Sequence, residues 1–82
     1  MLKNVTKQEL LDAGGKPWNH RIYMNEQAIR TLIKQDNFTI DHAKVWYDCD
    51  NKQLMTDKWS IRAELNYYGL NCKQQYRRYY TS

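Results

Sequence analysis

The stretch Ala43–Thr56 has the pattern of a β-hairpin and constrains the fold more than any other part of the chain. Apolar and polar side chains alternate on both sides of a polar turn, which is the spacing of two half-buried antiparallel strands. A two-residue loop at Asn51-Lys52 would pair Cys49 with Leu54. Because alternate side chains of a strand point to opposite faces, Cys49 is expected in the core and Trp46 on the other face. We therefore expect an exposed aromatic ring at Trp46.

Two segments before the hairpin have the start and stop signals of short helices. Thr6 is a capping residue with Glu9 three positions later, the spacing of a capping box, and the helix that follows is expected to end at Gly14. A second helix is predicted over residues 26–35, where the apolar side chains form a single stripe. Asn25 precedes it as a good N-cap.

A third helix is predicted after the hairpin, within residues 57–69. It would begin at Asp57 or Ser60 and end at Gly69, with Leu70 packing back onto the last turn in a Schellman motif. The side chains of this segment also alternate as in a strand, which leaves a strand as the alternative. Its strong helix formers and the Gly-Leu stop favour the helix.

Together these elements predict a small α+β fold. Residues 21–25 alternate as a strand, and residues 17–20 before them have the composition of a turn-like link. The predicted order is α-β-α-β-β-α, with a three-stranded antiparallel sheet and the helices on one face. We assign residues 1–70 to a single α+β domain and residues 71–82 to a basic, tyrosine-rich C-terminal tail.

The residues that could carry catalysis or bind a metal are scattered along the chain. The two histidines and two cysteines lie on four separate segments, without the local pairs that metal sites use: His20, His42, Cys49 and Cys72. No phosphate-binding loop or catalytic triad pattern is present. We therefore expect a non-enzymatic protein with no cofactor and no metal site.

The chain has neither an apolar run near the roughly 18 residues that a membrane span needs nor the pattern of a secretory signal. The expected location is therefore cytoplasmic, with reduced thiols and no membrane partner.

Nucleic-acid binding is one functional hypothesis, because the net charge is +4 and basic residues accumulate near the C-terminus. There the cations are interleaved with amides and tyrosines, a chemistry suited to phosphate contact and base stacking. Arg30 would extend such a surface. The candidate nucleic-acid-binding residues are Arg21, Tyr23, Lys73, Tyr76, Arg77 and Arg78.

Protein binding is the favoured hypothesis, because seven tyrosines and three tryptophans are more rings than the core of an 82-residue chain can hold. Tyr, Trp and Arg are also the residue types most often found at interface hot spots. The chain would be a protein-interaction module that binds another protein or itself. By analogy, its size suits a phage or mobile-element accessory protein that inhibits a host protein or defence complex. The candidate protein-binding residues are Trp46, Tyr76, Arg77, Arg78, Tyr79 and Tyr80.

Overall fold

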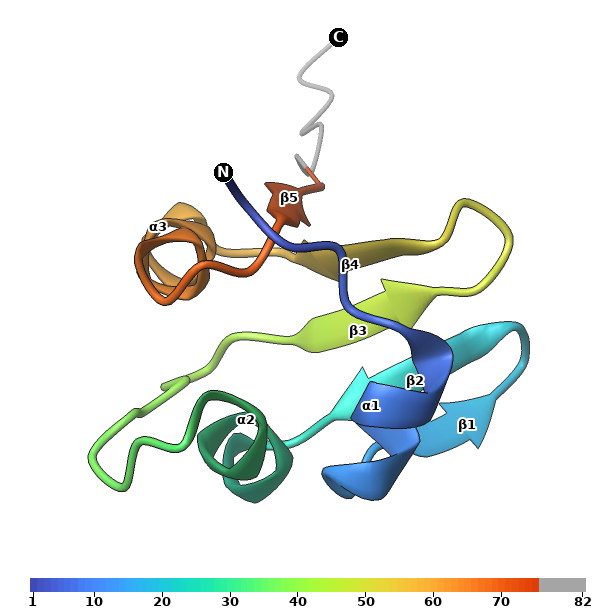
Figure 1. Ribbon diagram of the computed structural model, residues 1–82, viewed down its shortest axis with the longest axis horizontal. Helices are drawn as coiled ribbons and strands as arrows, with labels where there is room; N and C mark the ends of the chain where they lie inside the picture. The colour runs from blue at the N-terminus through green and yellow to red at the C-terminus, as the bar shows by residue number, and fades with distance from the viewer. Residues whose placement is uncertain (76–82) are drawn as a thin grey trace, which may run out of the picture.

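The computed structural model describes residues 1–75, which form a five-stranded sheet and short helices (Figure 1). The strands are β1 (Lys16–Trp18), β2 (Arg21–Met24), β3 (Val45–Asp48), β4 (Gln53–Thr56) and β5 (Cys72–Gln74). The helices are α1 (Lys7–Asp12), α2 (Glu26–Ile33) and α3 (Trp59–Tyr67). The strands lie in sequence order, and each pairs antiparallel with the next except β5, which runs parallel to β4. None of these helices is long and apolar enough to cross a membrane.

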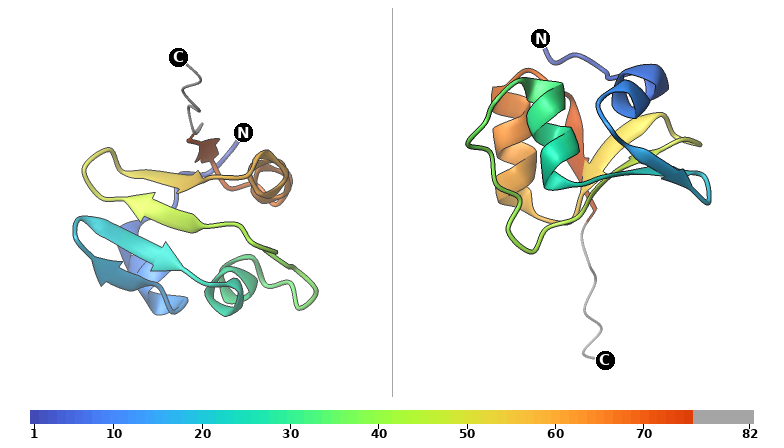
Figure 2. Two further views of the ribbon diagram at one scale, coloured as in Figure 1. Left: turned by 180° about the vertical axis from the view of Figure 1, so that it is seen from behind. Right: turned by 90° about the horizontal axis from the view of Figure 1, so that it is seen from below.

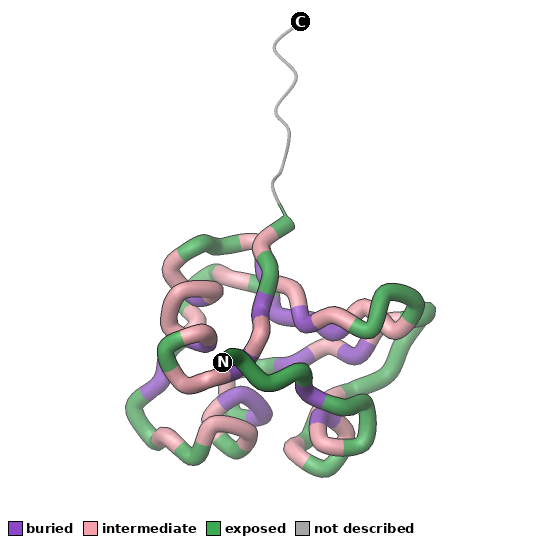
Figure 3. The backbone as a smooth tube through the Cα atoms, turned by 45° about the horizontal axis from the view of Figure 1, so that its top comes forward, coloured by how far each residue is buried: buried purple, intermediate pink, exposed green. Residues whose placement is uncertain are grey.

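The helices of residues 1–75 pack on the same face of the sheet, as the right-hand view of Figure 2 shows. Buried positions on the strands and helices are drawn in purple in Figure 3. Alternate strand residues meet the helices in one core, which includes Leu10, Ile22, Ile29, Val45, Leu54, Leu65 and Cys72. The opposite face of the sheet is covered by none of the described helices. We call it the open face.

The α+β class and the placement of the helices on one face are as predicted, but the sheet has five strands rather than three. It is mixed rather than antiparallel, because β5 runs parallel to β4, and the order is α-β-β-α-β-β-α-β instead of α-β-α-β-β-α. The first additional strand, β1, lies where a turn-like link was predicted at residues 17–20. It joins β2 through Asn19-His20, whose φ angles of 51° and 66° are both positive. Two positive φ values in a two-residue loop match the twist of a tight hairpin. Because Asn and His are less typical there than Asn-Gly, the sequence signal was weak.

The second additional strand, β5, lies within residues 71–82, which were predicted to form a tail. Cys72 is buried in the core, and its N–H donates to Asn66 Oδ1 at 3.0 Å. The N–H of Gln75 donates to the carbonyl of Thr56 at 2.9 Å and so extends the pairing with β4. The sheet therefore continues past residue 70. The predicted contact residues from Tyr76 to Tyr80 lie outside the described residues.

Both predicted signals of α1 are confirmed. Thr6 and Glu9 form the capping box, because each side chain accepts the backbone N–H of the other residue. Gly14 has a φ of +113° and donates to the carbonyl of Leu11, while Gly15 donates to that of Leu10. This is the Schellman pattern, in which a left-handed residue ends the helix.

The other two helices were predicted correctly in kind, with shifted ends. Asn25 caps α2 through a 2.8 Å bond from the N–H of Ala28. α2 then ends at Ile33, before residue 35, because Lys34 takes a left-handed conformation. The alternative strand over residues 57–69 is wrong, since α3 spans most of that segment.

The end of α3 has the predicted Schellman geometry, whereas its start differs. Leu70 N–H donates to the carbonyl of Leu65, after Gly69 with a φ of +89°. The N-cap is Lys58 rather than Asp57 or Ser60. The reason is that the Asp57 carboxylate accepts the N–H of Lys44 at 2.8 Å and is occupied by the strand connection.

The β3–β4 hairpin forms with the predicted faces and a different register. Trp46 pairs with Met55, and Leu54 pairs with Tyr47 rather than with Cys49. The connection spans residues 49–52 because the Asp48 carboxylate accepts the N–H groups of Asp50 and Asn51 and closes a wider turn.

Candidate functional site

The open face carries two rows of side chains that run across neighbouring strands. The first row, from β1 to β4, is Trp18, Arg21, Asp48 and Gln53. The second row, from β2 to β5, is Tyr23, Trp46, Met55 and Lys73. Because directly paired residues share a face of the sheet, these eight side chains form one continuous surface.

A pair of aromatic rings lies at the β1 end of the open face. The ring centroids of Trp18 and Tyr23 are 6.4 Å apart, with their planes tilted by 49°. Trp18 is 67% exposed, because β1 is the edge strand and the ring has a neighbour on one side only among the described strands. The pair therefore presents flat apolar surface to solvent.

Trp46 lies on the predicted face but is not the exposed ring that we expected there. It is only 5% exposed, and it stands apart from the core that joins the helices to the sheet. Tyr23 and Met55 flank it across the sheet, and the guanidinium of Arg21 lies 5.1 Å from its ring centroid. These neighbours come from β2 and β4, so the burial depends on register rather than on local sequence.

The exposed tryptophans of the described chain are Trp18 and Trp59, neither of which was a predicted contact residue. Trp59 is 63% exposed at the start of α3, and Tyr67 near the end of the same helix is 83% exposed. Trp18 directly precedes a tight turn at the end of an edge strand, and this position in the sequence could have indicated that its ring is exposed. Recognition of β1 as a strand was needed to interpret it.

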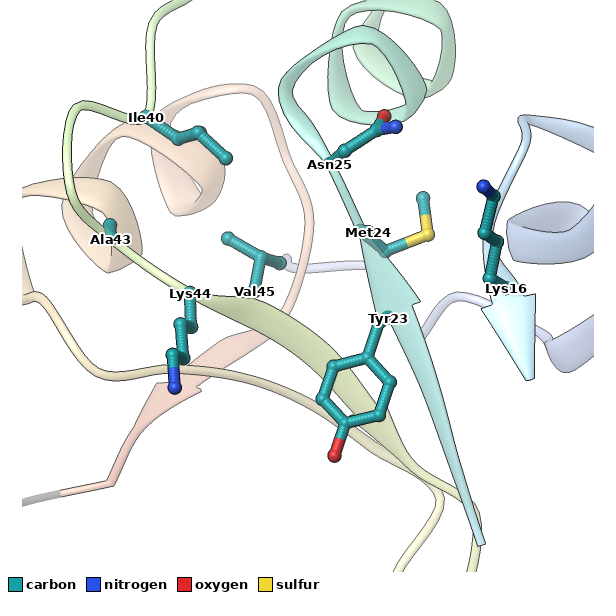
Figure 4. Close-up of a pocket in the computed structure, with 8 residues that line it drawn as sticks. All are labelled: Lys16, Tyr23, Met24, Asn25, Ile40, Ala43, Lys44 and Val45. Atoms are coloured by element: carbon teal, nitrogen blue, oxygen red, sulfur yellow. The ribbon is translucent and has the colours of Figure 1, made fainter. Parts of the chain in front are cut away.

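Three cationic side chains share the open face with the ring pair. Figure 4 shows the ring of Tyr23 and the side chain of Lys44 pointing to the same side, away from Met24. Lys73 is exposed on β5, because its neighbour Cys72 points into the core. Together with Arg21 on β2, these lysines place positive charge from the second strand to the β5 edge of the face.

Asp48 supplies a negative charge within the first row. Hydrogen bonds from the side chain and backbone of Asn51 lower the pKa of its carboxyl, and the nearby charge of Arg21 lowers it further. The carboxylate is therefore ionised at neutral pH. Its oxygens are largely used in closing the β3–β4 turn.

An open polar hollow of about 470 Å³ lies where the open face meets the two hairpin turns. It is lined by Asn19, His20, Arg21, Tyr23, Asp48 and Asp50. The two turns are tied together by the N–H of Cys49, which donates to the carbonyl of His20 at 3.1 Å. The walls of the hollow are thus held at a fixed distance.

Three of the residues predicted for nucleic-acid binding, Arg21, Tyr23 and Lys73, lie together on the open face. Arg30 does not join them. It lies on α2, where its Nε donates to the carbonyl of Phe38 at 2.7 Å and its Nη2 lies 2.7 Å from Glu26 Oε2. Tyr76, Arg77, Arg78, Tyr79 and Tyr80 lie outside the described residues.

The thiols and imidazoles lie in separate places. Burial raises the pKa of the Cys72 thiol to about 12, so this group is protonated and unreactive at neutral pH. Cys49 is half-buried, while His20 and His42 are exposed. Within residues 1–75, no group of three or more His, Cys, Asp or Glu side chains is placed to hold a metal ion.

Comparisons with protein-family models, with curated proteins and with solved structures found no match for this chain.

Proposed function

We propose that the chain is a non-catalytic binding protein whose open face holds a single-stranded nucleic acid. The observation that carries this proposal is the ring pair of Trp18 and Tyr23, in which Trp18 is 67% exposed, on the same face of the sheet as Arg21 and the two lysines. Single-strand binding proteins combine aromatic rings, on which bases stack, with cations that follow the phosphates. The net charge of +4 favours the same class of partner.

The spacing of the groups suits a strand that crosses the sheet. Bases would stack on Trp18 and Tyr23 at the β1 end, and the backbone would run along the second row toward Lys73 on β5. Since neighbouring strands lie about 4.8 Å apart, the three steps from β2 to β5 cover roughly 14 Å. Stacking needs unpaired bases with free faces, so a single strand fits this surface better than a duplex does. The predicted contacts of Arg77 and Arg78, which follow β5 in sequence, belong to the same proposal.

The test measures fluorescence anisotropy of a labelled oligothymidylate of about twelve nucleotides, at several salt concentrations from about 50 mM upward. Trp18→Ala is the test variant and Trp59→Ala the matched control, because both tryptophans are similarly exposed and only Trp18 lies on the open face. We expect Trp18→Ala to weaken binding at least about tenfold, since base–aromatic stacking contributes about 1–3 kcal/mol per base. Trp59→Ala should bind as the wild type does. Lack of binding by the wild type at about 50 mM salt would refute the proposal.

The second candidate function is protein binding through α3. It corresponds to the hypothesis of a protein-interaction module, but the contact surface is α3 instead of Trp46 and the C-terminal residues. Trp59 and Tyr67 are eight positions apart, close to two helical turns, so they lie on one side of the helix. They are also among the most exposed large side chains of the described chain. A phage or mobile-element inhibitor of a host protein would use such a surface.

The same two tryptophan variants separate the candidates. For protein binding, Trp59→Ala should lose a partner that wild type and Trp18→Ala both retain in a pull-down from the native host. Sedimentation velocity of the purified chain tests self-association through the same helix. If the partner binds all three proteins equally and the chain sediments as a monomer, α3 is not the contact surface.

A further inference from the structure

We infer that the polar hollow beside the ring pair reads one base of the bound strand and selects guanine. This inference rests on the proposed function, because it assigns specificity to the same surface. The hollow adjoins the open face directly, since Arg21 and Tyr23 belong to both. A base that stacks on the ring of Tyr23 therefore has its hydrogen-bonding edge at the mouth of the hollow. The volume of about 470 Å³ lies within the range of small-molecule sites and accommodates one base.

Asp50 is the acceptor that the hollow offers to a base. Its side chain is 75% exposed, and His20 Nδ1 lies 3.9 Å from its Oδ1. That separation is too long for a hydrogen bond, so the lone pairs of the carboxylate face solvent. Asp48 differs, because its oxygens already accept bonds from the turn. Asp48 is therefore a positioning residue that fixes the backbone of Asp50.

Guanine is the base whose edge matches this acceptor. Its N1–H and N2 amino group are adjacent donors, and a carboxylate has two oxygens that accept both at once. Uracil and thymine have one donor between two carbonyl oxygens, which an anion repels. Adenine and cytosine place a single amino group beside an unprotonated ring nitrogen. The Asp50 carboxylate thus discriminates in favour of guanine.

Donors next to Asp50 complete the match, because O6 of guanine lies beside N1–H on the same edge. Asn19 and His20 line the hollow from the β1–β2 turn, and either side chain can donate to the O6 carbonyl of guanine. Both residues have positive φ angles in the tight turn between β1 and β2. The 3.1 Å bond from Cys49 N–H to the His20 carbonyl fixes this wall relative to Asp50.

The test compares three labelled oligouridylates of about eight nucleotides, one unmodified, one with a single central guanosine and one with inosine in its place. Wild type should bind the guanosine strand about tenfold more tightly than the unmodified strand, because a bidentate pair discriminates by about 1–3 kcal/mol. Inosine lacks the N2 amino group and should lose most of this preference. Asp50→Asn should bind all three strands alike. The matched control is Asp41→Asn, which removes the same charge from an exposed loop and should keep the preference.

His20→Ala provides a second variant at an exposed position whose side chain lies outside the core. It should reduce the guanosine preference severalfold without changing binding to the unmodified strand. If wild type binds every strand equally, or prefers another base, the assignment of the hollow is wrong while stacking on the open face stands. If wild type binds no strand, the proposed function fails together with this inference. An unchanged guanosine preference in Asp50→Asn would also overturn the assignment.

Discussion

The guanidinium of Arg21 lies 5.1 Å from the ring centroid of Trp46, on the face of the sheet opposite the helices. The two residues come from neighbouring strands and are diagonal in the register, since Arg21 pairs with Asp48 and Trp46 pairs with Tyr23. A cation over an indole ring contributes about 0.5–2 kcal/mol, according to how far it is desolvated. The contact therefore both shields Trp46 and fixes one positive charge beside the ring pair.

The first prediction concerns this contact. Arg21→Ala should expose the Trp46 ring and shift its fluorescence emission to longer wavelength. The measurement uses a background with Trp18→Phe and Trp59→Phe, in which Trp46 is the remaining tryptophan. Lys34→Ala, which removes an exposed cation at the end of α2, is the control and should leave the emission unchanged. An unchanged emission in Arg21→Ala would show that other side chains shield Trp46.

The second prediction concerns the approach of α1 to the sheet. A Cβ atom on Gly15 would lie 2.6 Å from Ile22 Cγ2 and 2.7 Å from Met24 Sδ, well inside normal contact. Gly15→Ala should therefore destabilise the fold by about 1–3 kcal/mol, as overpacking does in other cores. At Gly69 nothing lies within 4 Å, and Ala there meets only the strain of a φ of +89°. Gly69→Ala should cost about 1 kcal/mol, the penalty of a left-handed backbone for a residue with a Cβ. Urea unfolding measures the free energy of unfolding of both variants. A smaller loss of stability for Gly15→Ala than for Gly69→Ala would contradict the close contact of Gly15 with Ile22 and Met24.

Local signals in the sequence were sufficient for the helices and for the faces of the long strands. The capping box of Thr6 and Glu9 and the stop at Gly69 act within a few residues, so they can be recognised without knowledge of the rest of the fold. Strand alternation likewise placed Trp46 opposite the core. Each of these features is determined by neighbours in sequence.

The missed features depend on partners far away in the chain. β1 and β5 have three residues each, too few for alternation to be recognised, and β5 pairs with a strand sixteen or more positions earlier. The burial of Trp46 needs Arg21, a residue from another strand, to lie over its ring. The open face could not be recognised as a surface until all five strands were in order, although Arg21, Tyr23 and Lys73 were each candidates.

The third prediction concerns acid stability. The hydrogen bond from the Lys3 side chain, followed by that from the Thr6 N–H, lowers the pKa of Glu9 from its ordinary value of 4.5. A carboxyl with a depressed pKa in the folded state stabilises the fold above the unfolded value, and this stabilisation is lost as pH falls through the folded pKa. The free energy of unfolding of wild type should therefore exceed that of Glu9→Gln at pH 7, with the difference shrinking below about pH 4.5. Glu64→Gln, which replaces a carboxyl on α3 that makes no side-chain hydrogen bond within the described residues, serves as the control. A difference that is constant from pH 7 to pH 3 would contradict the ionised capping box.

The fourth prediction concerns the two thiols. Cys72 has a pKa raised to about 12 by burial, and it lies in the core between β4 and α3. Cys49 is half-buried at the start of the β3–β4 turn, beside a hollow of about 520 Å³. At neutral pH one thiol per chain should react with N-ethylmaleimide, and the second should react only when urea unfolds the chain, because thiolate is the reactive form. Mass spectrometry of the labelled peptides measures both, and Cys49→Ser should abolish the native reaction. If Cys72 in the folded chain were labelled as fast as Cys49, neither burial nor the raised pKa would be protecting its thiol. That result would show that β5 opens from the sheet.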